Sequence, residues 1–240
     1  LMPTASAAAI IAGKLGGSIQ NLTSFTLLSN IATAIIVPIF FPVVNPEAGI
    51  EFWQAFWMIL RKISPLLIAP FLAAWLLRYV YDQYHKGRGS DKRFGLTPKL
   101  ASMPFYVWVV TLVILMGDLT YSLLHQQYSL WTIVILCVGS LITCLMQFGL
   151  GKWIGYCNPA GTKGSDYKDV LINPAAANYT MQQVSQITAG QAFGQKNTAL
   201  GVWMAQMFLH PLAAIGPAAY IIWQNLFNSW QLWREGKVRG

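Results

Sequence analysis

The stretch Gly190-Gln191-Ala192-Phe193-Gly194-Gln195-Lys196-Asn197-Thr198 interrupts an otherwise apolar part of the chain. Glycine, amide, amine and hydroxyl groups gather here, where a membrane-spanning helix would carry apolar side chains. In hydrocarbon an unpaired polar group costs several kcal/mol, so broken backbone at that depth is tolerated only against protein or a wet cavity. An ammonium such as that of Lys196 at the centre of a spanning helix costs about 2.5 to 3.5 kcal/mol. The stretch therefore predicts a broken helix with its free ends at a transport site.

The composition of the whole chain is that of an integral membrane protein. Hydrophobic residues make up 55% and charged residues 10%, with a mean hydropathy of +0.47, whereas a soluble domain carries about 25% charged residues. The apolar runs at 22–44, 103–124 and 129–151 are long enough to span a bilayer as helices. The net charge of +8 does not indicate nucleic acid, because the basic residues gather in short loops. The sequence predicts an all-α membrane protein.

Lysine and arginine predict the orientation of the spans. The positive-inside tendency places the strongest basic loop, residues 86–99, in the cytoplasm. It places the segment 152–186 and the basic C-terminal end on the same side. Residues 51–63 predict an interfacial helix that leads into a span at about 65–81. The chain opens at Leu1-Met2-Pro3 within an apolar segment. We therefore expect the beginning of the protein to be missing, with Met2 as a genuine start as the alternative.

The two ends of the chain repeat one order of elements: a polar break, a short apolar half-helix, a tight turn and a full helix. The breaks are at 3–6 and 195–198. The charge rule sends the first half-helix inward and the second outward, which is the pattern of an inverted repeat whose interrupted helices bind substrate and ion near the midplane. We predict the end of a first repeat at 1–44, a second repeat of five spans at 45–240, its broken helix at about 183–209 and its last span at about 212–233.

The helix after each break carries polar residues at helical spacing. In the first they are Thr23, Thr26, Asn30 and Thr33, and in the last Gln224, Asn225 and Asn228. Such groups either hold helices together, at about 0.6 kcal/mol each, or line a cavity. A stripe that faces a broken helix favours the cavity.

These motifs resemble those of the bile acid:sodium symporter family, including its bacterial members. That family has a Gly-Gly-Thr-Ala-Ser-Asn break and a Glu-x-Gly-Met-Gln-Asn-Thr/Ser break. Here Pro3-Thr4-Ala5-Ser6-Ala7 is similar to the first, and Ala192-Phe193-Gly194-Gln195-Lys196-Asn197-Thr198 to the second. The similarity covers nearly the whole chain and places Leu1 inside the family's fourth helix. It implies a multi-pass secondary transporter of the bacterial inner membrane, with a cytoplasmic C-terminus, that moves an organic anion such as a bile acid or another carboxylate with sodium.

The resemblance also implies a substrate and ion site. Its candidate residues are Thr4, Ser6, Thr26, Asn30, Gln195, Lys196, Asn197 and Thr198, with sodium, if bound, near Ser6, Thr26 and Gln195. Three positions depart from the family: Ala192 replaces its acidic residue, Lys196 its glutamine and Ala7 its first-break asparagine. A carboxylate and two amide oxygens are thus lost and a cation is gained.

We therefore hypothesise that the Lys196 ammonium stands where sodium would sit. Withdrawal from water favours the neutral amine, which would make Lys196 a proton carrier and transport proton-coupled, or else uncoupled. The alternative is that Lys196 reaches the interface, or pairs with an acid outside this chain, without any role in coupling.

Other function classes receive less support. No His-Glu-x-x-His motif, Gly-x-Ser-x-Gly motif or intramembrane acid pair occurs in the sequence, so we expect no catalytic activity and no cofactor beyond a coupling Na⁺ or H⁺. The expected partners are a small organic anion and the bilayer. A membrane sensor or scaffold that keeps the transporter fold without moving substrate stays open.

Overall fold

The computed structural model describes residues 2–44, 51–86, 129–158, 179–209 and 211–239, with a few positions between 110 and 121. The predicted span at 103–124, most of the basic loop at 86–99 and the outward turn at His210 lie outside these residues.

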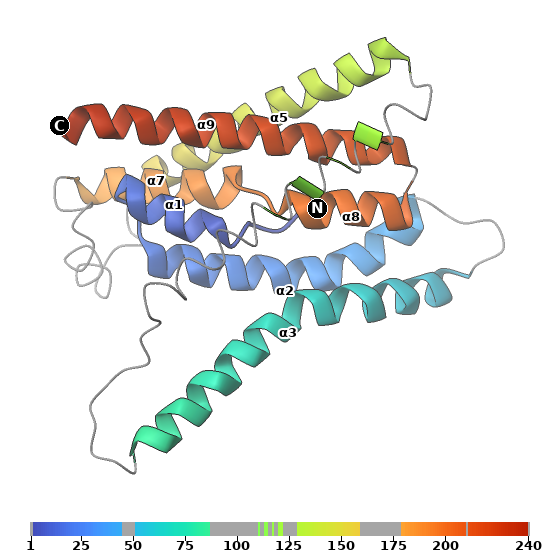
Figure 1. Ribbon diagram of the computed structural model, residues 1–240, viewed down its shortest axis with the longest axis horizontal. Coiled ribbons are helices and arrows are strands. Elements are labelled where there is room, and N and C mark those ends of the chain that lie inside the picture. The colour runs from blue at the N-terminus through green and yellow to red at the C-terminus, as the bar shows by residue number, and fades with distance from the viewer. Residues whose placement is uncertain are drawn as a thin grey trace. The chain divides into compact units, whose positions relative to one another are not determined.

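The described residues form helices and no strand, apart from one isolated bridge, so the all-helical prediction is confirmed for them. The elements are α1 (Ala7–Leu15), α2 (Ile19–Val44), α3 (Phe52–Lys86), α5 (Leu130–Cys157), α7 (Met181–Gly194), α8 (Thr198–Phe208), a 3-10 turn (Pro211–Ala214) and α9 (Ile215–Arg239) (Figure 1). By length and composition, two of them could cross a membrane: Ile19–Val43 of α2 and Leu130–Cys157 of α5, with mean hydropathies of 1.9 and 2.3.

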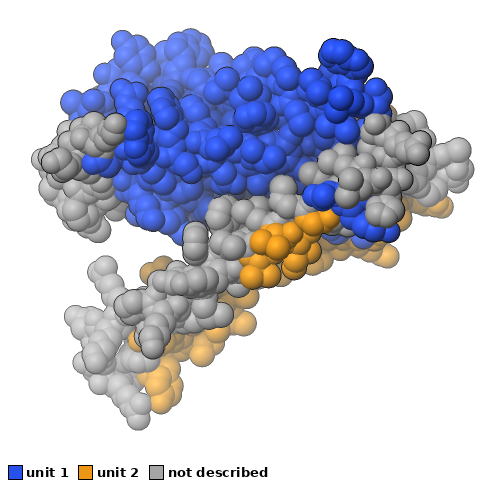
Figure 2. Space-filling model, turned by 45° about the horizontal axis from the view of Figure 1, so that its top comes forward, with its two compact units in different colours: residues 1–29, 119–240 blue, residues 30–118 orange. Residues whose placement is uncertain are grey.

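The chain divides into two compact units (Figure 2). The first holds residues 1–29 and 119–240, and the second holds residues 30–118. The cut falls inside α2. The first unit joins the two ends of the chain because α1 packs on α7.

In the second unit, α3 is one helix of 35 residues, where the sequence predicts an interfacial helix followed by a separate span. The helix continues past Pro65 and bends part-way along its length (Figure 1). A bend is the usual consequence of a proline, which removes one helical hydrogen bond. One exposed ion pair, Arg78 with Asp82 at 3.9 Å, links successive turns.

Two glycines of α5 set the packing of the first unit. A Cβ atom on Gly151 would lie 2.4 Å from the carbonyl oxygen of Ala189, and one on Gly155 would lie 2.5 Å from that of Ser185. Their spacing of four puts both on one helix face, and the missing side chains let the backbone of α7 approach α5 directly. This contact fixes the position of α7 and therefore of its C-terminal end, Gly194.

The helix α1 also packs against α7. Ala8, Ala12, Leu22 and Ala192 form a buried apolar cluster. Gly16 ends α1 in the left-handed conformation, with φ of 93°, which suits glycine because it has no Cβ. After this turn, Ser18 N donates a 2.8 Å hydrogen bond to Thr188 Oγ1 of α7. Both ends of the α1 region are thus attached to the broken helix.

Candidate functional site

Two short stretches of extended backbone meet between the helices of the first unit. Gln195–Asn197 separate α7 from α8, and Pro3–Ser6 precede α1. Thr4 and Lys196 form an antiparallel bridge. Ala5 N donates to Gln195 O at 3.1 Å, and Asn197 N donates to Pro3 O at 2.7 Å. We call these two stretches, Pro3–Ser6 and Gln195–Asn197, the crossing.

The crossing is narrower than the polar stretch that predicts it. Residues Met181–Gly194 are helical, so only the last part of the 190–198 stretch is interrupted. From the crossing, α1 and α8 run away in opposite directions, while α7 leads into it (Figure 1). Two helices therefore begin at the crossing, and one ends there.

Side chains of α9 satisfy the backbone of the second break. Lys196 N donates to Gln224 Oε1 at 3.1 Å, and Gln224 Nε2 donates to Lys196 O and to Thr198 Oγ1, both at 3.4 Å. The Tyr220 hydroxyl donates to Gly194 O at 2.8 Å. Asn197 caps α8, because its Oδ1 accepts a 3.2 Å hydrogen bond from Leu200 N. The break is therefore a fully bonded structure and not a loose loop.

The first break is attached to α2 and α7 through Thr4. Thr4 is buried and lies just before α1. Its N–H donates to Ser29 Oγ of α2 at 3.1 Å, and its hydroxyl donates to Ala192 O of α7 at 2.9 Å. Ser6 is the N-cap residue of α1 but is exposed, and its side chain makes no capping hydrogen bond.

The predicted site residues on α2 have mixed outcomes. Thr26 is buried and donates to Leu22 O at 2.8 Å. Asn30, one turn further along α2 and in the second unit, is buried too, as is Thr33. Thr23, which shares the predicted polar face, is exposed, and its hydroxyl donates to Ile19 O at 2.8 Å, the same type of bond within the helix that Thr26 makes.

A chain of buried amides leads from the crossing along α7 to α9. Gln195 Nε2 donates to Gln191 Oε1, and Gln191 Nε2 donates to Gln231 Oε1, each at 2.7 Å. Asn228 Oδ1 is a buried side-chain acceptor that has no hydrogen-bond partner among the described residues. Sequence reasoning missed Gln191 and Gln231. The signal was present, since Gln191 precedes Gln195 by one turn, and 224, 228 and 231 share one helix face.

Lys196 brings a positive charge to this otherwise neutral site. The residue is half-buried, and within the described parts of the chain its ammonium makes no ion pair. The described residues hold no cluster of three or more His, Cys, Asp or Glu side chains. The oxygens at the crossing are amides, hydroxyls and carbonyls, which suit a polar solute or a weakly held monovalent cation.

No model of a known protein family, no curated protein and no solved structure matches the chain.

Proposed function

We propose that this chain forms the core of a secondary transporter that moves an organic anion, a bile acid or another carboxylate, across the bacterial inner membrane. The observation that carries the proposal is the backbone bridge between Thr4 and Lys196. It joins two interrupted segments from opposite ends of the sequence, from which α1 and α8 leave in opposite directions. Transporters with inverted repeats place substrate and coupling ion at such interruptions, near the middle of the bilayer.

The surface of α5 supports insertion into a bilayer. Only 17% of its apolar window is buried within the structure, and large side chains such as Trp131 (76% exposed) and Ile135 (65%) are uncovered. In water an apolar surface of this extent promotes association, whereas lipid tails solvate it. Two helices long and apolar enough to span, in α2 and α5, favour a multi-pass arrangement. The basic residues at the end of α9 favour a cytoplasmic C-terminus.

Two positive features at the crossing favour an anionic substrate. The first turn of α1 lacks a side-chain cap, and although Ala8 N donates to Ala5 O at 3.0 Å, the positive end of the helix dipole faces the crossing and attracts a negative group. The second feature is the Lys196 ammonium, which has no ion-pair partner in the described structure. A carboxylate bound here would accept hydrogen bonds from backbone N–H groups and would be attracted by the Lys196 ammonium.

The same charge supports a change in coupling. A fixed ammonium repels a second cation held within a few ångströms, most strongly where water is excluded. The proposed roles are therefore that Lys196 replaces sodium at the crossing and that Thr4, Ser6, Thr26, Gln195, Asn197 and Thr198 line the site. Transport is then coupled to protons or is uncoupled.

Uptake into proteoliposomes by the full chain tests this proposal. The probes are labelled taurocholate and labelled pyruvate, each with a sodium gradient, with a pH gradient and with neither. We expect uptake of one probe to persist without sodium. Lys196→Gln is expected to reduce that uptake about tenfold or more, because a charged contact to the anion is lost. Lys14→Gln, which removes an exposed charge at the end of α1, is the matched control and should leave uptake unchanged.

Two results would contradict the proposal in different ways. Strict sodium dependence that survives in Lys196→Gln would exclude the lysine from coupling. Saturable binding of a probe without counterflow would identify the sensor or scaffold and exclude transport.

A further inference from the structure

Two cations lie on a shared aromatic surface where α5 and α9 end, away from the crossing. Lys152 Nζ lies 5.6 Å from the ring centroid of Phe227, and the Arg234 guanidinium lies 5.9 Å from that of Trp230. The two rings are themselves 5.5 Å apart. The lysine stem crosses Gly190 of α7, where an added Cβ would come within 2.9 Å of Lys152 Cγ. Packing thus holds Lys152 on the same surface as Arg234.

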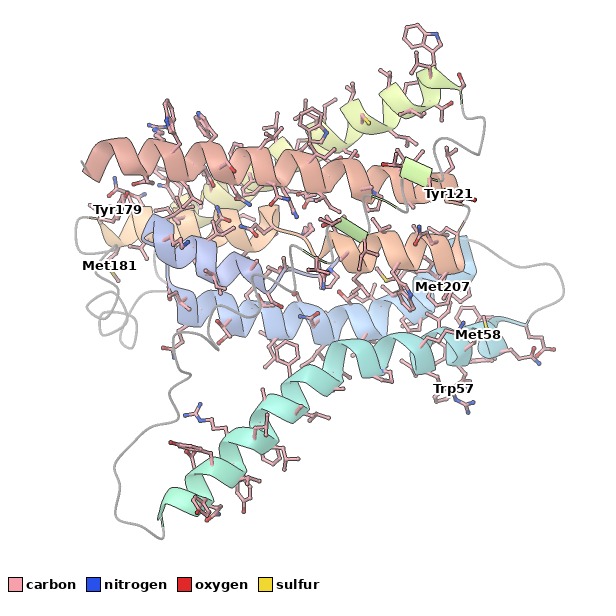
Figure 3. All side chains as sticks on the ribbon, viewed as in Figure 1. Trp57, Met58, Tyr121, Tyr179, Met181 and Met207 are labelled. Atoms are coloured by element: carbon pink, nitrogen blue, oxygen red, sulfur yellow. The ribbon has the colours of Figure 1, made fainter. Side chains whose placement is uncertain are left out.

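The two charges are not neutralised within the described residues. Neither Lys152 nor Arg234 makes an ion pair in that part of the chain. The nearest acid along α9, Glu235, instead accepts a hydrogen bond from the Tyr179 hydroxyl at the start of α7 (Figure 3). The two cations face neighbouring rings, and like charges on one surface repel each other. An anion bound there would attract both cations.

The surroundings specify which kind of anion fits. Trp153, Trp230 and Trp233, which are next to these cations in sequence or in space, are exposed by 63%, 47% and 58%. Tryptophan is enriched where membrane meets water, and the apolar helix α5 ends here. A ligand for this place needs a negative head for the cations and an apolar body for the rings. A guanidinium also offers paired donors to phosphate oxygens.

We propose that Lys152 and Arg234 bind the phosphate of an anionic phospholipid at the cytoplasmic ends of α5 and α9, with Phe227 and Trp230 against its upper acyl chains. The site rests on the bilayer insertion proposed above and not on transport.

Native mass spectrometry of the full chain, titrated with phosphatidylglycerol and with phosphatidylcholine, tests the site. We expect the wild-type protein to retain phosphatidylglycerol about tenfold more strongly than phosphatidylcholine. The double variant Lys152→Gln/Arg234→Gln should lose this preference, whereas Lys152→Arg/Arg234→Lys should keep it. Arg61→Gln/Lys62→Gln removes the same net charge from exposed positions of α3 and should also keep it.

The outcomes separate the possible failures. An unchanged preference in Lys152→Gln/Arg234→Gln would overturn the site. Displacement of the lipid by inorganic phosphate in excess would show a phosphate site rather than a lipid site and would also overturn the proposal. If the wild-type protein retains neither lipid, the lipid site is overturned, whereas insertion and uptake are decided by the proteoliposome experiment. If phosphatidylglycerol is retained but neither probe is taken up, the lipid site is supported and only the proposed transport is contradicted.

Discussion

The two breaks at the crossing are similar in sequence pattern but are held in different ways. The second break, Gln195–Asn197, is bonded by side chains of α9, of which Gln224 satisfies both the N–H and the carbonyl of Lys196. The first break, Pro3–Ser6, has no such dedicated partner. Two of its backbone bonds go to the second break itself, and a third goes to Ser29. Its helix begins at an exposed serine without a side-chain cap.

This difference indicates that the second break is the support and the first break depends on it. A polar group already satisfied by protein is costly to disturb, whereas one without a partner is free to bind a ligand. The chain therefore combines a rigid half, α7 to α9, with a second half in which the uncapped start of α1 can bind a ligand. Three pairs of substitutions test this: the first pair compares two glycines within the rigid half, and the other two compare one half with the other.

The largest effect is expected at Gly194, where α7 ends. A Cβ there would lie 2.3 Å from atoms of the buried Phe148 ring, so Gly194→Ala should destabilise the fold by about 3 kcal/mol through overpacking. Gly201→Ala in α8 is the matched control, because its Cβ meets mainly the flexible side chain of Met2. The melting midpoint in mild detergent measures both, and about 2 to 4 °C is expected per kcal/mol. Equal midpoints for the two variants would contradict the rigidity assigned to the second break.

A smaller effect is expected from Gln224→Leu. It leaves the N–H and carbonyl of Lys196 without their side-chain partner, at a cost of about 2 kcal/mol. Ser29→Ala removes one acceptor from Thr4 N in the first break and should cost about 1 kcal/mol. Unfolding of both variants in detergent gives the comparison. If Ser29→Ala lowers the free energy of unfolding more than Gln224→Leu does, then the first break supports the second and not the reverse.

The smallest effects concern the two helix starts. Thr180 caps α7 in a reciprocal capping box with Gln183, so Thr180→Ala should lower stability by about 1 kcal/mol. Ser6→Ala should leave the melting midpoint unchanged, because the Ser6 side chain makes no capping bond. If Ser6→Ala nevertheless weakens binding of the transported anion, the hydroxyl serves the ligand and not the helix. A clear loss of stability in Ser6→Ala would remove the distinction between the two breaks.

Local sequence predicts part of this site and misses the rest for identifiable reasons. The cluster of glycine, amide and amine groups locates the break, because such groups do not fit an unbroken apolar helix. The break predicted at 195–198 agrees with the interruption at Gln195–Asn197, whereas Gly190–Gly194 of the surrounding polar stretch stay helical where α5 approaches α7 closely. The amide chain from Gln195 through Gln191 to Gln231 also escapes prediction, because its last link joins residues 40 positions apart. Thr23 is exposed although Thr26, whose hydroxyl is bonded within α2 in the same way, is buried. Helical spacing places both residues near one face, and only the packing around α2 decides which of them is covered.

The sequence by itself determined the apolar runs that form helices, the order of break, half-helix and full helix at each end, and the presence of a lysine among amides. These follow from the chemistry of neighbouring residues, which hydrophobicity and helical spacing record directly. Only the tertiary structure decided that Thr4 pairs with Lys196, that α9 satisfies one break and not the other, and that Lys152 and Arg234 share an aromatic surface. Each of these contacts joins residues far apart in the chain, and the close approach of α5, α7 and α9 brings them together.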